Sequence, residues 1–173
     1  MERIKQALKR AREAHADNPQ PKPRQPAGPR HSHEKAPVEQ KIVYSQTRKI
    51  EISSDDLRRR RVISSLSDPV ATHYSVLRTH VVQRMRSNEW LSLAITSPDI
   101  GAGKSLTAVN LASSLAREVN QTVLLVDLDL KRPRIRQYFT DDHLPGISDY
   151  LLDDMPLHEI LFNPGIERLV VLP

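Results

Sequence analysis

The order of apolar and polar positions after residue 90 predicts strands that alternate with helices. Short apolar runs predict strands at 91–96, 122–128 and 168–172. The residue spacing or composition predicts helices at 104–117, 134–139, 147–152 and 157–162. Such alternation is typical of a parallel sheet covered by helices on both faces, so we expect an α/β fold.

The pattern before residue 90 predicts a helix and a strand ahead of this unit. Residues 41–52 have strand-like composition, and residues 68–85 read as a helix with Asp68 as N-cap and Pro69 at the first helical position. Apolar residues of that helix recur at helical spacing and predict a core-facing stripe at Val70, Tyr74, Leu77, Val81 and Met85.

The first 40 residues differ from the rest in composition. Residues 1–17 place apolar side chains at helical spacing among Lys and Arg, which predicts a short amphipathic helix that docks on a partner, on the protein itself or on an anionic membrane. Residues 18–40 are rich in proline and predict an extended, disordered linker. The chain therefore divides into a helix at 1–17, a linker at 18–40 and one folded domain at 41–173.

Charge separates the same two parts of the chain. Residues 1–61 carry 16 Lys and Arg against 8 Asp and Glu, whereas residues 62–173 carry 10 against 13. A basic tail fits an anionic partner or a solvated segment equally well. The chain has no cysteine, which excludes disulfides and thiol chemistry, and it has no apolar run long enough to span a bilayer. We expect a cytoplasmic protein.

A loop rich in glycine joins the predicted strand at 91–96 to the predicted helix at 104–117. The loop reads Ser-Pro-Asp-Ile-Gly-Ala-Gly-Lys-Ser over residues 97–105 and matches the end of the phosphate-loop pattern, with Pro98 in its first glycine position. Glycines let backbone N–H groups turn inward without Cβ clashes, and the helix N-terminus adds a positive dipole. We expect nucleoside triphosphate binding, with ATP and Mg²⁺ as the ligands. The expected binding residues are Asp99, Ile100, Gly101, Ala102, Gly103, Lys104, Ser105 and Leu106.

Two carboxylates close the second apolar strand. Asp127 and Asp129 would share one face if the strand extends that far, at the sheet edge where ligands of open α/β folds bind. They could hold Mg²⁺ or accept a proton from an attacking hydroxyl. A strand-end turn with a helix-capping aspartate would explain one of the two carboxylates but hardly both. The predicted metal ligands are Ser105, Asp127 and Asp129, and the predicted catalytic residues are Lys104, Asp127 and Asp129. The basic residues that follow (Lys131, Arg132, Arg134 and Arg136) could neutralise phosphate or bind an acidic partner.

The two motifs together resemble those of the bacterial tyrosine kinases that pair with polysaccharide chain-length regulators. The resemblance rests on S-P-D-I-G-A-G-K-S, T-A-V-N-L-A and V-L-L-V-D-L-D-L-K-R-P, and it covers most of residues 40–173. It implies a P-loop NTPase fold, with Lys104 and Ser105 on phosphate and Mg²⁺ and with Asp127 and Asp129 divided between Mg²⁺ and the tyrosine hydroxyl. Related partitioning ATPases carry a signature lysine where this chain has Asp99, which favours the kinase branch.

The chain departs from that family in three places. Of the family's E-x-x-R-x-x-R subunit-contact motif, only Arg78 is present. The family's C-terminal tyrosine cluster is replaced by four scattered tyrosines, Tyr44, Tyr74, Tyr138 and Tyr150. A downstream strand ending in Asp-x-Pro-Pro does not occur before Pro173. We therefore expect a partial domain, truncated at its C-terminal side.

The resemblance implies a tyrosine autokinase or regulatory ATPase of exopolysaccharide or capsule biosynthesis. A membrane-embedded chain-length regulator would recruit the protein to the inner face of the plasma membrane, self-association is a further possibility, and no nucleic acid is expected as a partner. Two alternatives stay open: a non-kinase ATP-dependent switch of the partitioning type, and an inactive nucleotide-binding fragment.

Overall fold

The computed structural model describes Lys9 and residues 47–65, 67–118 and 121–173. The predicted N-terminal helix, apart from Lys9, and the proline-rich linker lie outside the described residues, as do residues 41–46 of the first predicted strand. Within the described residues, no helix is long and apolar enough to cross a membrane.

A small mixed sheet forms the centre of the described part. Its strands are β1 (Arg48–Lys49), β2 (Val123–Val126), β3 (Phe162–Asn163) and β4 (Leu169–Leu172), and their order across the sheet is β1-β3-β4-β2. The pairs β1–β3 and β2–β4 are parallel, and β3 and β4 are antiparallel. The α/β prediction is confirmed, although the sheet is mostly rather than wholly parallel.

Strands β2 and β4 carry the strongest sequence signal and form the longest pairing. Their register runs from Val123 opposite Leu169 to Val126 opposite Leu172. On β4, Leu169 and Val171 are fully buried, and on β2 Leu125 faces the same core. The two strands predicted at 122–128 and 168–172 are therefore confirmed, with slightly shorter bounds.

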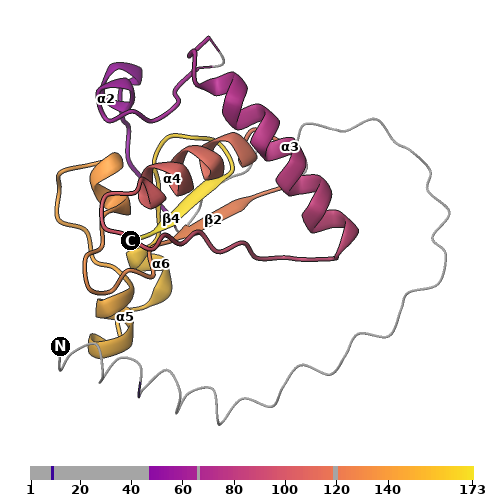
Figure 1. Ribbon diagram of the computed structural model, residues 1–173. Coiled ribbons are helices and arrows are strands. Elements are labelled where there is room, and N and C mark those ends of the chain that lie inside the picture. Colours follow the sequence, from indigo (N-terminus) through magenta and orange to yellow (C-terminus); the bar gives the residue numbers. More distant parts are fainter. Residues whose placement is uncertain (1–8, 10–46, 66, 119–120) are drawn as a thin grey trace, which may run out of the picture.

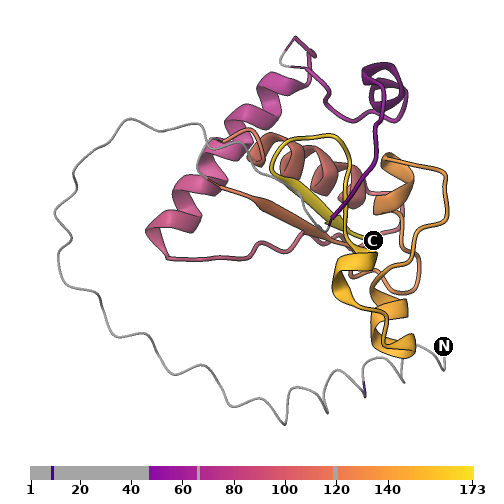
Figure 2. The ribbon, with the colours of Figure 1, turned by 180° about the vertical axis from the view of Figure 1, so that it is seen from behind.

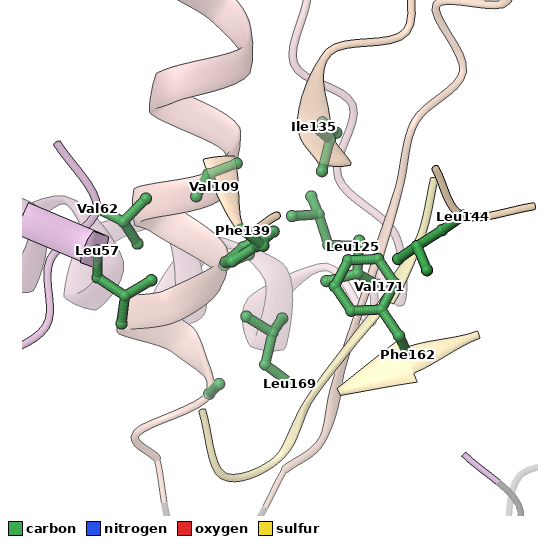
Figure 3. Close-up of a cluster of buried hydrophobic side chains, with 12 residues drawn as sticks. Leu57, Val62, Val109, Leu125, Ile135, Phe139, Leu144, Phe162, Leu169 and Val171 are labelled. Atoms are coloured by element: carbon green, nitrogen blue, oxygen red, sulfur yellow. The ribbon is translucent and has the colours of Figure 1, made fainter. Parts of the chain in front are cut away.

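Helix α4 (Lys104–Leu115) covers one face of this sheet (Figure 1). Val109 points from α4 into a core that includes Leu125, Phe139 and Phe162 (Figure 3). Ala112 of the same helix belongs to this core. The rings of Phe139 and Phe162 meet edge to face with centroids 6.0 Å apart. The opposite face of β2 carries Leu124, which is 56% exposed, so the expectation of helices on both faces fails at β2 within the described residues.

Helix α3 (Ala71–Ser87) packs on α4 rather than on the sheet (Figure 2). It begins two residues later than predicted, with Val70 rather than Asp68 as N-cap, because Pro69 lies in a turn in which Asp68 accepts hydrogen bonds from the backbone of Val70 and Ala71. The predicted core-facing stripe is wrong in part. Val70 and Leu77 are substantially exposed, and Ala71 is the buried residue of the helix, because α3 covers another helix with only a narrow face.

Sequence reasoning missed helix α2 (Ser54–Arg59). The Ser53 hydroxyl accepts a hydrogen bond from the Asp56 backbone N–H at 3.1 Å and donates one to the Asp56 carboxylate at 2.6 Å. A serine followed three residues later by an acidic residue is a helix-start signal that the sequence did contain. The helix ends where Arg61 adopts a left-handed conformation with φ 61°.

Of the three helices predicted between β2 and β4, two are shorter in the structure and one keeps its predicted length to within a residue. The predicted helix at 134–139 is the 3₁₀ helix η1 (Ile135–Tyr138), and α5 (Ile147–Asp153) confirms the helix at 147–152. The helix predicted at 157–162 ends early as α6 (Leu157–Ile160), because Phe162 and Asn163 pair as β3 with β1 and β4. The strand predicted at 41–52 is confirmed only as β1.

The strand predicted at 91–96 is absent. This segment returns from the end of α3 toward the start of α4 without entering the sheet (Figure 1), and Leu91 and Leu93 are 97% and 48% exposed. A strand needs a neighbouring backbone to pair with, and no described strand pairs with this segment. The apolar pattern alone was therefore not sufficient to form a strand.

Candidate functional site

The glycine-rich loop lies on the surface and runs directly into α4. Gly101 and Gly103 adopt left-handed conformations with φ 84° and 88°. A Cβ atom at either position would meet no atom within 4 Å, so the reason for glycine is the backbone conformation and not the Cβ clash expected from the sequence. Two left-handed residues fold the loop over the start of the helix.

Helix α4 places two of the predicted residues at its first turn. Gly103 is the N-cap, and Lys104 and Ser105 are the first two helical residues. The free N–H groups and the positive end of the helix dipole therefore lie against the loop, an arrangement that attracts anions. The turn holds no acidic residue that would compete for this positive potential.

Lys104, the first residue of α4, forms an ion pair with Asp129 in the loop that follows β2. The lysine ammonium donates to the Asp129 carboxylate at 2.7 Å, and the two side chains are 37% and 31% exposed. The hydrogen bond from Lys104 is the largest of several contacts that hold the pKa of Asp129 below its usual value. The structure therefore brings together one residue from the loop motif and one from the acidic motif.

Asp127 is bonded differently from Asp129. It is 5% exposed, and its carboxylate accepts three backbone hydrogen bonds. One oxygen accepts from the Asp129 N–H at 3.0 Å, and the other accepts from the N–H groups of Arg134 and Ile135 at 2.7 and 2.9 Å. Strand β2 ends at Val126, so the condition under which both aspartates would share a strand face is not met.

The sequence leaves a helix-capping role open for one of the two aspartates, and these three bonds give that role to Asp127. The carboxylate of Asp127 closes the loop at 128–134 and satisfies the first N–H groups of η1. Ile135 is buried in the core, which anchors the far end of the loop. The residue types do not show which of the two aspartates makes such bonds, because the donors are backbone groups whose position depends on the path of the loop.

The other predicted residues lie around this pair with different exposure. Asp99, Ile100 and Ala102 are exposed, and Ile100 is 75% exposed, whereas Ser105 and Leu106 are half-buried. The basic residues that follow the acidic motif differ in their contacts. Lys131, Arg132 and Arg134 are exposed, and Arg136 donates to the backbone carbonyls of Asp141 and Asp142.

The donor chemistry at the site fits Mg²⁺ held jointly with a bound phosphate. Mg²⁺ prefers oxygen ligands and commonly uses one or two carboxylates together with water and substrate phosphate. A hydroxyl on Ser105 and a carboxylate on Asp129 are of this type. Among the described residues, no group of three His, Cys, Asp or Glu side chains is gathered as a metal site.

Arg78 and the tyrosines bear on two of the departures noted in the sequence. Arg78 forms an ion pair with Glu118 at 3.1 Å and donates to the Ser114 carbonyl at 3.2 Å, so it links α3 to α4 within the chain. Tyr150, on α5, is 45% exposed, while Tyr138 packs against the core. Tyr44 lies outside the described residues.

Comparisons with known proteins identify the relatives of this chain. No protein-family model matches it, and no solved structure matches it. The chain is 32% identical over 103 residues to EpsB of Ralstonia nicotianae, which is 58% of this chain and 14% of EpsB. It is 29% identical over 118 residues to tyrosine-protein kinase YwqD of Bacillus subtilis, covering 66% of this chain and 49% of YwqD.

A third relative has a similar identity and coverage. Tyrosine-protein kinase CpsD of Streptococcus agalactiae is 32% identical over 102 residues, which is 58% of this chain and 43% of CpsD. The chain thus spans half the length or less of these relatives. The phosphate-loop and acidic motifs, the α/β fold and these similarities agree, and they make the chain a distant relative of the bacterial tyrosine-protein kinases.

Proposed function

We propose that this chain binds ATP with Mg²⁺ at the loop formed by residues 97–105. The observation that carries the proposal is the position of Lys104, which is the first residue of α4 and reaches Asp129 at the end of β2. A helix N-terminus, a lysine charge and an adjacent carboxylate are the parts that a Mg²⁺-triphosphate complex requires. The site is open to solvent, so a nucleotide can reach it.

The residues of the loop have distinct roles in this proposal. The backbone N–H groups at Gly101–Gly103 and the start of α4 would bind the phosphates, and Lys104 would neutralise their charge. Ser105 and a carboxylate of the acidic motif would hold Mg²⁺, which draws negative charge from the β- and γ-phosphates. A phosphate that binds Lys104 competes with Asp129 for the ammonium, so the 2.7 Å ion pair must open or share its proton donors when nucleotide binds.

We further propose that the site transfers the γ-phosphate to tyrosine, in a protein that serves exopolysaccharide or capsule synthesis. The relatives named tyrosine-protein kinases support the activity, because they match more than half of this chain. Phosphoryl transfer depends mainly on positioning and charge neutralisation, which these residue types supply. A membrane-embedded chain-length regulator is the proposed partner.

The first test is nucleotide binding and labelling with the full chain. Wild-type protein, Lys104→Met and Lys49→Met are incubated with γ-labelled ATP and Mg²⁺. Lys49 is an exposed lysine of β1 with no part in the proposed site, so its variant controls for loss of one positive charge. We expect binding and tyrosine label in wild type and Lys49→Met, and loss of both in Lys104→Met.

The outcomes separate the alternative functions. Released phosphate without labelled protein would support an ATP-dependent switch in place of a kinase. Nucleotide binding without either product would support an inactive nucleotide-binding unit. Equal binding by wild type and Lys104→Met would contradict the proposed site itself.

A further inference from the structure

The two aspartates of the acidic motif differ in what they contact, although their spacing makes them look equivalent. Asp129 is partly exposed and bonds to Lys104. Asp127 is 5% exposed, and its contacts in the described structure are backbone N–H groups on its own loop. A carboxylate offers about four lone-pair sites. Three of those on Asp127 are therefore taken before any ligand arrives.

We infer that Asp127 is a positioning residue that holds the loop at 128–135 in shape, and that Asp129 is the carboxylate of this motif that meets the Mg²⁺-nucleotide complex. This division of roles rests on the proposed function of the site. It assigns the two aspartates separately, which the residue pattern could not do.

The geometry explains how Asp127 acts on Asp129. The bond from the Asp129 N–H to Asp127 fixes the backbone of Asp129 at 3.0 Å from the buried carboxylate. The bonds from Arg134 and Ile135 fix the other end of the loop, and Ile135 is also anchored in the core. With both ends of the loop held, the Asp129 side chain is directed toward Lys104.

Loss of the Asp127 carboxylate would leave buried N–H groups without an acceptor. Asparagine has nearly the same shape but presents one oxygen and one NH₂ group, so it can satisfy only one side of the arrangement. The NH₂ group would then face a backbone N–H. We expect the loop to open more often in Asp127→Asn, which would weaken every contact that the loop makes with nucleotide.

Asp129→Asn would act by another route. It removes the charge that faces Lys104 and keeps the three backbone bonds to Asp127. The loop should therefore keep its shape, and Asp129→Asn should weaken only the part of nucleotide binding that depends on Mg²⁺.

The experiment combines amide hydrogen exchange with nucleotide affinity on the full chain. The proteins are wild type, Asp127→Asn, Asp129→Asn and Asp68→Asn. Asp68 also accepts a backbone N–H through its side chain, from Val70 at 3.1 Å, and it lies at the start of α3, so it is a matched control. Affinity for a non-hydrolysable ATP analogue is measured with Mg²⁺ and with EDTA.

For Asp127→Asn, we expect exchange at the Arg134 and Ile135 amides to rise about tenfold or more, because these N–H groups lose their acceptor. Nucleotide affinity should fall by a similar factor with Mg²⁺ and with EDTA. For Asp129→Asn, the two amides should keep their wild-type exchange, and the ratio of Mg²⁺ to EDTA affinity should fall about tenfold or more. Asp68→Asn should match wild type in both measurements.

Two results would overturn the inference. The first is a fall in the Mg²⁺ to EDTA affinity ratio in Asp127→Asn like that of Asp129→Asn, since this would place Asp127 on the metal. The second is unchanged exchange at Arg134 and Ile135 in Asp127→Asn.

A wild-type measurement covers the case in which Asp127→Asn does not fold. With the nucleotide analogue present, addition of Mg²⁺ should leave the Arg134 and Ile135 amides as protected as in EDTA. A loss of protection would show the Asp127 carboxylate turning from these amides to the metal, and would overturn the inference. If wild type binds no nucleotide, the proposed function fails, and the exchange rates of Asp127→Asn still decide whether this residue holds the loop.

Discussion

The carboxylate of Asp129 is shared between Lys104 and its own loop. One oxygen accepts from the Lys104 ammonium at 2.7 Å, and the other accepts from the Arg132 backbone N–H at 3.1 Å. Both bonds favour the ionised form and hold the pKa of Asp129 below the ordinary value of 3.8. The first turn of α4 is thereby tied to the loop that follows β2.

The Lys104–Asp129 pair makes a prediction about pH. The folded pKa of Asp129 is lower than its unfolded pKa, so the pair stabilises the fold above the unfolded value of 3.8 and loses this contribution as pH falls through the folded pKa. The effect on overall stability should be small, because both side chains are about one-third exposed.

Carboxyl NMR titration is the direct measurement. The Asp129 titration midpoint should lie below 3.8 in wild type and should rise toward 3.8 in Lys104→Met, because the largest cause of its low pKa is removed. Lys131→Met serves as the charge-matched control. A midpoint that is the same in wild type and Lys104→Met would contradict the ion pair.

A second prediction concerns Asn110, a buried polar residue of α4. Its side-chain oxygen accepts from the Ile63 N–H at 2.9 Å, and its NH₂ group donates to the Arg61 carbonyl at 3.0 Å. Asn110→Leu has similar volume but leaves the buried Ile63 N–H and the partly buried Arg61 carbonyl unpaired. We expect it to lower the free energy of unfolding by about 2–4 kcal/mol.

Urea unfolding measures this loss. Gln83→Leu, at an exposed position of α3, is the matched amide-to-leucine substitution and should change stability by no more than about 0.5 kcal/mol. A similar small change in Asn110→Leu would show that the connection between α2 and α3 is not held by Asn110.

These cases show which parts of the structure local sequence patterns can predict. Helix α4 and strands β2 and β4 were predicted because their apolar spacing is regular and each buries one face in the core. The segment at 91–96 has an equally apolar pattern but does not form a strand. Strand formation depends on a second backbone that is distant in sequence, and a local pattern does not report whether it is present.

The candidate site also could be predicted from the sequence only in part. The loop motif located Lys104 and the acidic motif located Asp129, and the structure brings these two together. The separate role of Asp127 could not be predicted, because it depends on the N–H groups of Arg134 and Ile135 rather than on any side-chain type. Motifs identified the charges, and the fold decided which of them faces the site.

A third prediction uses the left-handed residue at the end of α2. Arg61 has φ 61°, a conformation that costs an ordinary L-residue about 1 kcal/mol and costs glycine nothing. Arg61→Gly should therefore leave stability unchanged or raise it by up to about 1 kcal/mol. The same change two residues earlier, Arg59→Gly, lies inside the helix and should lower stability by about 1 kcal/mol.

Thermal unfolding of the two glycine variants provides the check. Opposite signs, or at least a clear difference in favour of Arg61→Gly, are expected. Equal destabilisation by both changes would mean that the left-handed conformation at residue 61 carries no strain.

The fourth prediction concerns the close approach of Gly146 to Pro173. The φ of Gly146 is −140°, which any residue can adopt, so conformation does not require glycine there. Space does: a Cβ atom at this position would lie 2.3 Å from the Pro173 carbonyl oxygen. The same oxygen accepts a hydrogen bond from the Ile147 N–H at 2.8 Å, which joins the start of α5 to the chain after β4.

Gly146→Ala must therefore push the two backbones apart and break this bond, at a cost of about 1–3 kcal/mol. Ser148→Ala, on the exposed side of the same helix, is the control and should stay within about 0.5 kcal/mol of wild type. Urea unfolding measures the cost, and exchange at the Ile147 amide shows whether the bond is lost. Wild-type stability with a protected Ile147 amide in Gly146→Ala would contradict the close approach, because no alanine fits this contact without moving backbone atoms.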